Sequence, residues 1–224
     1  MFPKRLAEGY RQFIDGRFNA ERARYRTLAE HGQEPEIMVI GCCDSRVAPE
    51  VIFDAGPGEL FVVRNVANLV PPYEAETQNY HGTSAALEFA VAALKVKHIV
   101  VMGHAHCGGI SAFVKGADAL SPSDFIGKWM TQIAPVAESL GEPDLDIGKQ
   151  LMRMELAVVE HSLKNLMSFP QVRRAVERGE LQLHGAYFGV ATGLLLVRDP
   201  NTGEFHPSDS PLLHATDASG TAPA

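Results

Sequence analysis

Short hydrophobic runs alternate with longer amphipathic stretches through the middle of the chain. Three runs rich in β-branched residues, each ended by glycine or a polar residue, predict buried parallel strands over 36–41, 60–64 and 98–103. The stretch 82–96 has the pattern of a crossover helix. Strands that alternate with helices favour an α/β fold, with a mostly parallel central sheet flanked by helices on both faces. We expect about four parallel strands.

The second half of the chain is predicted to be helical before it returns to the sheet. A helical pattern covers 122–140 and 147–178, with interruptions at GEPDLD (141–146) and at Pro170. The segment QLHGAYFGVATGLLLVRD (182–199) then predicts a strand, a turn and a closing strand. The closing strand would form an antiparallel edge of the sheet.

Both ends of the chain differ from this central pattern. Residues 1–35 show an intermittent helical pattern with a thin hydrophobic stripe, and we expect Gly9 and Gly16 to break it. This N-terminal helical arm could pack on another subunit or on its own domain. Residues 36–206 form the predicted α/β domain, and the small, polar residues 207–224 predict a flexible tail.

Composition narrows the class of protein. The chain has 224 residues, 46% hydrophobic and 21% charged, which indicates one globular domain with appendages. A net charge of −7 gives no reason to expect a nucleic-acid or membrane partner. The N-terminus lacks a secretory hydrophobic region, no run approaches the ~20 apolar residues of a membrane helix, and three cysteines form no disulfide framework. We therefore expect a cytoplasmic protein.

Two cysteine motifs follow predicted strands, GCCDSR at 41–46 and GHAHCGG at 103–109. The carboxyl ends of parallel strands meet at one edge of a sheet, where ligands bind, so these motifs should converge. Thiolates and imidazole are the ligands that Zn²⁺ prefers, and a Cys-His-Cys set leaves one tetrahedral position open, as in catalytic zinc sites. Adjacent Cys42 and Cys43 would not both reach one metal, and the residues alone leave open which of them binds.

The segments Cys42-x-Asp44-x-Arg46 and His104-x-x-Cys107 resemble the signatures of the β-class carbonic anhydrases, in particular the plant-type members. The resemblance continues through 57–73, 82–91 and 183–189 and covers roughly residues 30–200. It implies one zinc ion per chain. The implied zinc ligands are Cys42, His104 and Cys107, whereas Cys43 and His106 are not ligands.

The resemblance also implies roles around the metal. Asp44 would accept a hydrogen bond from zinc-bound hydroxide, and Arg46 would hold Asp44 ionised and oriented. Asp44 ligates zinc in a closed state of some family members, but we expect its pairing with Arg46 to prevail at alkaline pH. The implied substrate pocket comprises Gln33, Phe61 and Phe89, the last at a position where plant enzymes have tyrosine. We add Gly108, because a glycine that opens a helix after the last ligand lets the backbone come close to an anionic product. Such pockets are shared between subunits in this family, which implies a homo-oligomer, either a dimer or a multiple of dimers.

The implied reaction is the reversible hydration of carbon dioxide to bicarbonate and a proton. Two alternatives use the same fold, a hydrolase of carbon disulfide or carbonyl sulfide and a non-catalytic zinc-binding regulatory protein. A thiol redox protein is disfavoured because Cys42 and Cys43 lack the C-x-x-C spacing. One bacterial subgroup has a regulatory bicarbonate site built with Trp and Tyr. We expect no such site here, because Val39 and Phe188 stand at those positions.

Overall fold

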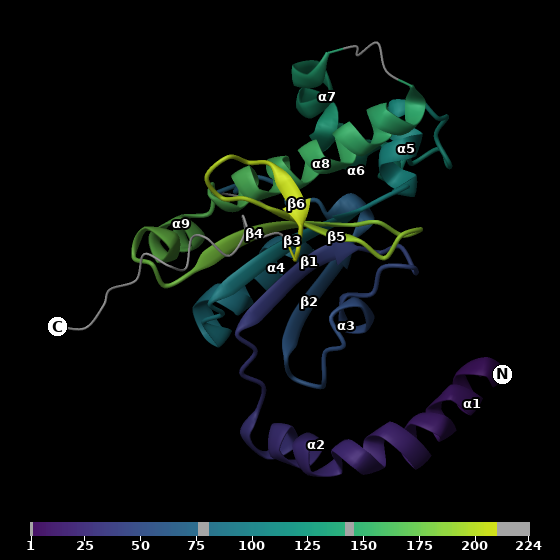
Figure 1. The fold of residues 1–224 in the computed structure, drawn as a ribbon, viewed down its shortest axis with the longest axis vertical. Coiled ribbons are helices and arrows are strands. Elements are labelled where there is room, and N and C mark those ends of the chain that lie inside the picture. Colours follow the sequence, from purple (N-terminus) through teal and green to yellow (C-terminus); the bar gives the residue numbers. More distant parts are fainter. Residues whose placement is uncertain (1, 76–80, 142–145, 210–224) are drawn as a thin grey trace.

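The computed structural model describes residues 2–75, 81–141 and 146–209. Its centre is a six-stranded sheet in the order β2-β1-β3-β4-β5-β6 (Figure 1). The strands are β1 (Ile37–Cys42), β2 (Leu60–Asn65), β3 (His98–His104), β4 (Gln182–Phe188), β5 (Leu195–Arg198) and β6 (Phe205–Pro207). The first four in the sheet are parallel, and β5 and β6 are antiparallel to their neighbours. The predicted α/β fold with four parallel strands is confirmed.

Strand β6 is an addition to the predicted sheet, because three residues ending in proline give too short a pattern to indicate a strand. The predicted C-terminal tail begins at the last residue of β6, and 210–224 lie outside the described residues.

The helices follow the predicted order. They are α1 (Lys4–Phe13), α2 (Asn19–His31), α3 (Pro49–Ile52), α4 (Gly82–Glu88), α5 (Gly108–Val114), α6 (Phe125–Met130), α7 (Ala134–Leu140), α8 (Ile147–Leu166) and α9 (Pro170–Glu177). Four short π or 3-10 segments accompany them: η1 (Ile14–Phe18) joins α1 to α2, η2 (Val66–Asn68) follows β2, η3 (Phe89–Leu94) continues α4, and η4 (Thr131–Ile133) joins α6 to α7. The predicted crossover helix corresponds to α4 and η3.

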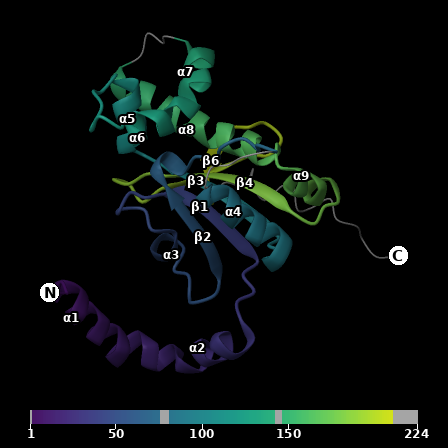
Figure 2. The same ribbon diagram turned by 180° about the vertical axis from the view of Figure 1, so that it is seen from behind.

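Helices cover the two faces of the sheet unequally. Helices α4, α8 and α9 pack on one face, where Leu87, Val159 and Val172 meet buried residues of β1 and β3 (Figures 1 and 2). On the other face, the cluster around Val39 receives Ile52 of the one-turn helix α3. The predicted helices are therefore present on both faces, but they cover much less of the second face than of the first. An open cavity of about 520 Å³ remains there, lined in part by Ile37, Val39, Phe53, Leu60 and Val100.

The N-terminal arm is helical from Lys4 to His31, through α1, η1 and α2. The predicted break at Gly9 is wrong, since Gly9 lies inside α1, and Gly16 lies in the π turn without ending the helix. One glycine inside a helix costs only about 1 kcal/mol relative to alanine, which neighbouring turns can offset. Figures 1 and 2 show the arm standing away from the sheet. None of the residues in α1, η1 and α2 is buried.

The arm contacts its own domain from its middle and from its second half. Arg17 and Arg24 donate hydrogen bonds to the carbonyl oxygens of Ala55 and Pro57, at 3.2 and 2.8 Å. Among the described residues, no helix combines the length and the hydrophobicity that crossing a bilayer requires.

Candidate metal centre

The two cysteine motifs converge at the carboxyl edge of the sheet, as predicted. Cys42 is the last residue of β1 and His104 is the last residue of β3, and these strands are parallel neighbours. Cys107 directly precedes α5. The three side chains are buried, and their candidate ligand atoms all lie within 4.8 Å of one another. In a tetrahedral zinc site two thiolate sulfurs stand about 3.8 Å apart, so the cluster needs little contraction to bind.

His104 is oriented for metal binding by its own backbone. Its Nδ1 lies 2.9 Å from the carbonyl oxygen of Ala105, and a carbonyl can only accept, so Nδ1 carries the proton. Nε2 is buried and has no hydrogen-bond partner. An orphaned buried ring nitrogen next to two thiols is the donor arrangement that Zn²⁺ binds. The residues present therefore fit a zinc ion.

The two sulfurs share one negative charge when no cation is present. The Cys107 thiol donates to the Cys42 sulfur, which holds the pKa of Cys42 well below its ordinary value, although burial opposes the shift. The pKa of Cys107 is raised, because its proton is held by the Cys42 sulfur and because it is buried. A second thiolate would therefore form only with a cation between the two sulfurs.

Asp44 and Arg46 form the predicted pair beside this cluster. Nε and Nη2 of Arg46 donate to the two carboxylate oxygens of Asp44 at 2.9 and 2.7 Å, and the Arg46 backbone N–H adds a bond of 3.0 Å. These hydrogen bonds hold the pKa of Asp44 well below its ordinary value. Arg64 supports the same turn by donating to the carbonyl oxygens of Cys42 and Asp44. The carboxylate is therefore ionised and fixed in orientation.

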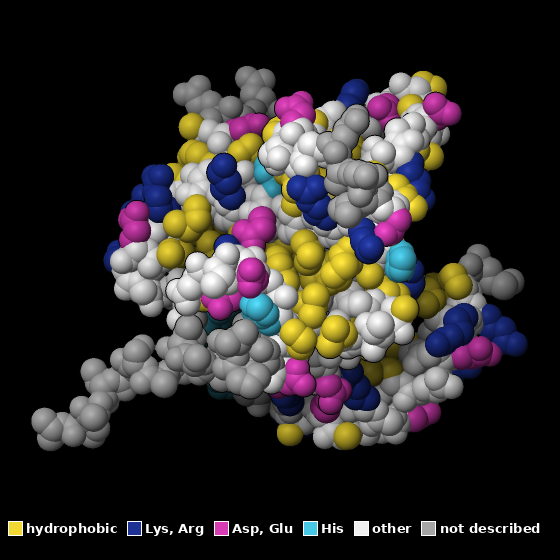
Figure 3. Space-filling view, turned by 45° about the horizontal axis from the view of Figure 1, so that its top comes forward, with side chains coloured by type: hydrophobic (Ala, Val, Ile, Leu, Met, Phe, Trp, Pro, Cys, Tyr) yellow, Lys and Arg dark blue, Asp and Glu magenta, His cyan; other side chains and the backbone are white. Residues whose placement is uncertain are grey.

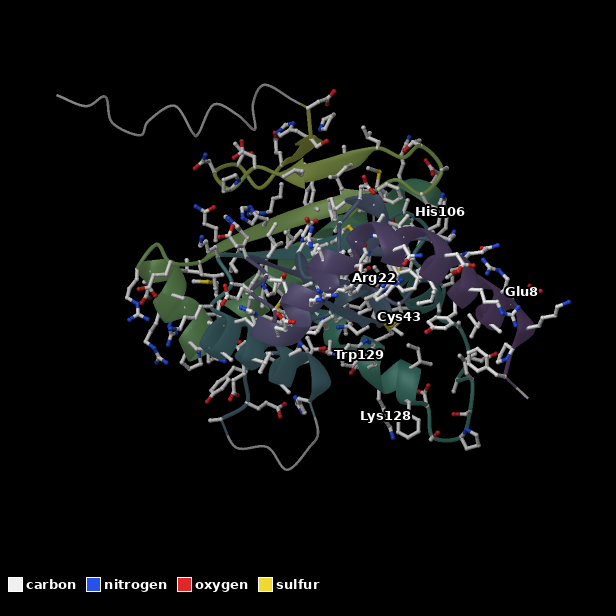
Figure 4. The ribbon with its side chains drawn as sticks, turned by 90° about the horizontal axis from the view of Figure 1, so that it is seen from below. Glu8, Arg22, Cys43, His106, Lys128 and Trp129 are labelled. Atoms are coloured by element: carbon white, nitrogen blue, oxygen red, sulfur yellow. The ribbon has the colours of Figure 1, made fainter. Side chains whose placement is uncertain are left out.

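The two residues that we expect not to bind metal are exposed at the edges of the cluster. Cys43 and His106 have exposed side chains, whereas the three candidate ligands are buried. Figure 4 labels both, on the side of the molecule toward which Glu8 of α1 also lies. The backbone of His106 is left-handed, with φ of 58°.

The single chain does not bring most of the predicted substrate pocket to the metal cluster. Gln33 precedes β1, and Phe61 lies four residues before the end of β2, about 13 Å along the strand from the residue that pairs with Cys42. Phe61 and Phe89 contact each other, with ring centroids 5.9 Å apart. Only Gly108, the first residue of α5, adjoins the cluster, and it lines an open cavity of about 430 Å³.

Sequence reasoning missed two buried polar residues behind the cluster. Glu155 of α8 accepts a hydrogen bond from the Cys107 backbone N–H at 3.0 Å and another from the Tyr187 hydroxyl at 2.7 Å. A signal was available, because Glu155 falls on the same helical face as the hydrophobic residues Val158, Val159 and Leu166.

Comparison with known proteins gives consistent matches. A family model described as carbonic anhydrase matches residues 37–195. The β-carbonic anhydrase 5 of Arabidopsis thaliana chloroplasts is 41% identical over 166 residues, which are 73% of this chain and 54% of that protein. A carbonic anhydrase of Synechocystis is 34% identical over 200 residues, covering 88% of this chain and 71% of the relative. The match thus spans about half the length of the Arabidopsis protein.

Solved structures agree with the sequence matches. The β-carbonic anhydrase CcaA superposes with a TM-score of 0.81 at 31% identity, covering 96% of this chain and 97% of that chain. A structure from work on two tetrameric β-carbonic anhydrases of Sordaria macrospora gives a TM-score of 0.73 at 31% identity, with 90% and 96% covered.

Proposed function

Since this chain belongs to the β-class carbonic anhydrases, we propose that it catalyses the reversible hydration of carbon dioxide to bicarbonate and a proton. The observation that carries the proposal is the buried Cys42-His104-Cys107 cluster, with its unpartnered imidazole nitrogen and the ionised Asp44 beside it. The membership rests on the family model and on the two relatives.

One zinc ion per chain would be held by the two cysteine sulfurs and by Nε2 of His104. When bound, zinc would lower the pKa of a coordinated water so that hydroxide is available near neutral pH, less strongly than with three histidine ligands because two thiolates donate more charge. The protein's own contribution is orientation. Asp44, fixed by Arg46, presents a carboxylate that accepts a hydrogen bond from the attacking oxygen and so aligns it with the substrate.

The test is stopped-flow measurement of carbon dioxide hydration on a sample whose zinc content is determined at the same time. Activity that scales with zinc content, and that disappears when a chelator removes the metal, is expected. A fully zinc-loaded protein without hydration activity would refute the proposal, and assays with carbonyl sulfide and carbon disulfide on that sample would then test the hydrolase alternative.

We further propose that the protein acts as a dimer or a multiple of dimers. Leu6 and Tyr10 of the arm are 56% and 63% exposed, and Figure 3 shows a continuous hydrophobic patch on one face of the molecule. The arm, residues 1–35, carries seven Lys and Arg against five Asp and Glu, whereas the rest of the chain is strongly acidic. A basic arm would be attracted to the body of a second copy.

A dimer would also complete the substrate pocket. Gln33, Phe61 and Phe89 lie away from the metal cluster of their own chain, so we propose that they serve the cluster of the partner. Sedimentation velocity at micromolar concentration should show dimers or larger species, and a fully active monomer would contradict this assignment.

We propose a reducing compartment, such as the cytoplasm, as the location. All three cysteines are free thiols, and the proposed metal site requires Cys42 and Cys107 to stay reduced. Fractionation of cells that express the full-length protein would test this location.

A further inference from the structure

Glu155 is a carboxyl group buried directly behind a candidate metal ligand. It is 2% exposed, and its two oxygens are occupied by the Cys107 backbone N–H and by the hydroxyl of Tyr187, which is itself 4% exposed. Within the described ranges, no lysine, arginine or histidine forms an ion pair with it. Burying a carboxyl group is costly unless its hydrogen bonds are satisfied, so these two bonds are important for keeping it inside.

The peptide group between His106 and Cys107 is held from two sides. Its carbonyl oxygen accepts a hydrogen bond from Nη2 of Arg46 at 3.1 Å, and its N–H donates to Glu155 at 3.0 Å. The C=O and N–H of a trans peptide point in opposite directions, so Arg46 and Glu155 lie on opposite sides of it. His106 has a left-handed φ of 58°, a conformation that costs roughly 1–2 kcal/mol outside glycine. The two bonds fix this unfavourable turn.

Close packing places the Glu155 carboxyl group. A Cβ atom on Gly103 of β3 would lie 2.7 Å from a methyl carbon of Val159, so only glycine allows α8 to approach the strand this closely. Tyr187 of β4 pairs with Gly103 across the sheet. Glu155 therefore reaches the turn after β3 from a helix packed on that strand, and Tyr187 restrains it from the neighbouring strand.

We propose that Glu155 is a positioning residue for the metal centre. By holding the N–H of Cys107 it directs the Cys107 sulfur toward the metal, and through the same peptide group it supports Arg46 and the carboxylate of Asp44. Tyr187 keeps Glu155 in this orientation. This role presupposes the metal binding that we propose for the cluster, and the hydrogen bonds and packing around Glu155 support it.

The test compares four variants of the full-length protein. Glu155→Leu keeps a similar volume but removes the acceptor, Glu155→Gln keeps an acceptor oxygen for Cys107, and Tyr187→Phe removes the restraint. Ser162→Ala is the matched control, because Ser162 is fully buried on the same helix but bonds the backbone of Asn68 and Val70. The readouts are the zinc dissociation constant from competition with a chelator and the visible spectrum of the cobalt-substituted protein.

Glu155→Leu should weaken zinc binding by about 10–100-fold, the usual effect of losing a partner that orients a metal ligand, and should alter the cobalt spectrum. Glu155→Gln should restore both toward wild type. Tyr187→Phe should weaken zinc binding less than Glu155→Leu does. If the leucine variant does not fold, the zinc affinities of Tyr187→Phe and Ser162→Ala are compared instead. Ser162→Ala should lower the melting temperature and leave metal binding unchanged.

The proposal is overturned if Glu155→Leu binds zinc as wild type does with an unchanged cobalt spectrum. It is also overturned if Ser162→Ala loses as much affinity as Glu155→Leu or Tyr187→Phe, because the effect would then be one of general stability. These readouts do not depend on turnover. If the wild-type protein fails to hydrate carbon dioxide while the metal measurements hold, the proposed function fails and the positioning role stands.

Discussion

Replacing Arg46 with alanine tests whether orientation of Asp44 limits catalysis. The change removes the two side-chain hydrogen bonds to the Asp44 carboxylate, at 2.9 and 2.7 Å, and leaves the backbone bond of 3.0 Å. It also removes the bond to the carbonyl oxygen of His106. Asp44 keeps its charge but loses its bidentate partner, and it becomes free to turn toward a bound metal ion.

The expected effect is large on activity and small on stability. The Arg46 side chain is 46% exposed, and exposed ion pairs contribute about 1 kcal/mol at most to folding, so the melting temperature should fall by no more than about 4 °C. Removing a group that orients a residue of the metal site usually lowers metal affinity or activity about 10–100-fold. Removing one oriented hydrogen bond to the reacting atoms usually lowers kcat about 100–1,000-fold. We therefore expect kcat/KM to fall about 100-fold, with zinc content unchanged. The loss should persist at high pH, because the guanidinium group of Arg46 does not titrate in this range.

The assay is stopped-flow hydration of carbon dioxide between pH 7 and pH 9, with zinc measured on each sample. Arg178→Ala is the matched control, since Arg178 pairs at 3.3 Å with the carboxylate two residues later, Glu180, just after α9. It should behave as wild type. Arg46→Lys keeps the charge without the planar fork and should fall between wild type and Arg46→Ala. A near-normal rate for Arg46→Ala, or an equal loss in the control, would refute the reasoning.

Three further predictions concern the ligands, the anion response and pH. Cys107→Ser should lose most of its zinc while Cys43→Ser retains it, as elemental analysis would show; zinc loss in Cys43→Ser alone would reverse the assignment. Because Val39 and Phe188 stand where the bicarbonate-regulated subgroup has Trp and Tyr, we expect plain saturation kinetics with bicarbonate, and cooperative inhibition would count against this. The lowered pKa of Asp44 means that its stabilising contribution is present above about pH 4 and is lost as pH falls through the lowered value. Acid titration should show Asp44→Asn losing less stability than wild type.

The central fold and the convergence of the two cysteine motifs were both predictable from the sequence. Cys42 and His104 directly end β-branched runs, and such runs in an α/β pattern place their carboxyl ends at one edge. The choice of Cys42 over Cys43 needed the family resemblance, and it agrees with the observed burial of one and exposure of the other.

Other features were beyond a reading of local pattern. Gly9 was expected to end a helix, but one glycine's propensity is outweighed by the turns around it. The burial of Glu155 could be expected from its helical face, but its role depends on the contact of α8 with the turn after β3, which connects residues 48 positions apart. The pocket that we propose for Gln33, Phe61 and Phe89 would need a second chain, and no pattern within one chain shows which surfaces two copies bring together.

The pairing of β1 with β3 also affects how the protein acquires its metal. Sixty-four residues separate Cys42 from Cys107 in the sequence. The length-dependent part of the entropic cost of closing a loop of that size is about 4 kcal/mol. The hydrogen bonds between β1 and β3 already close this loop, with Gly41 opposite Met102. A small zinc-dependent domain, in contrast, folds only as the metal closes its loops. Here the chain should keep its fold after metal removal, because zinc would only add to the stability of a sheet that its own contacts already hold together.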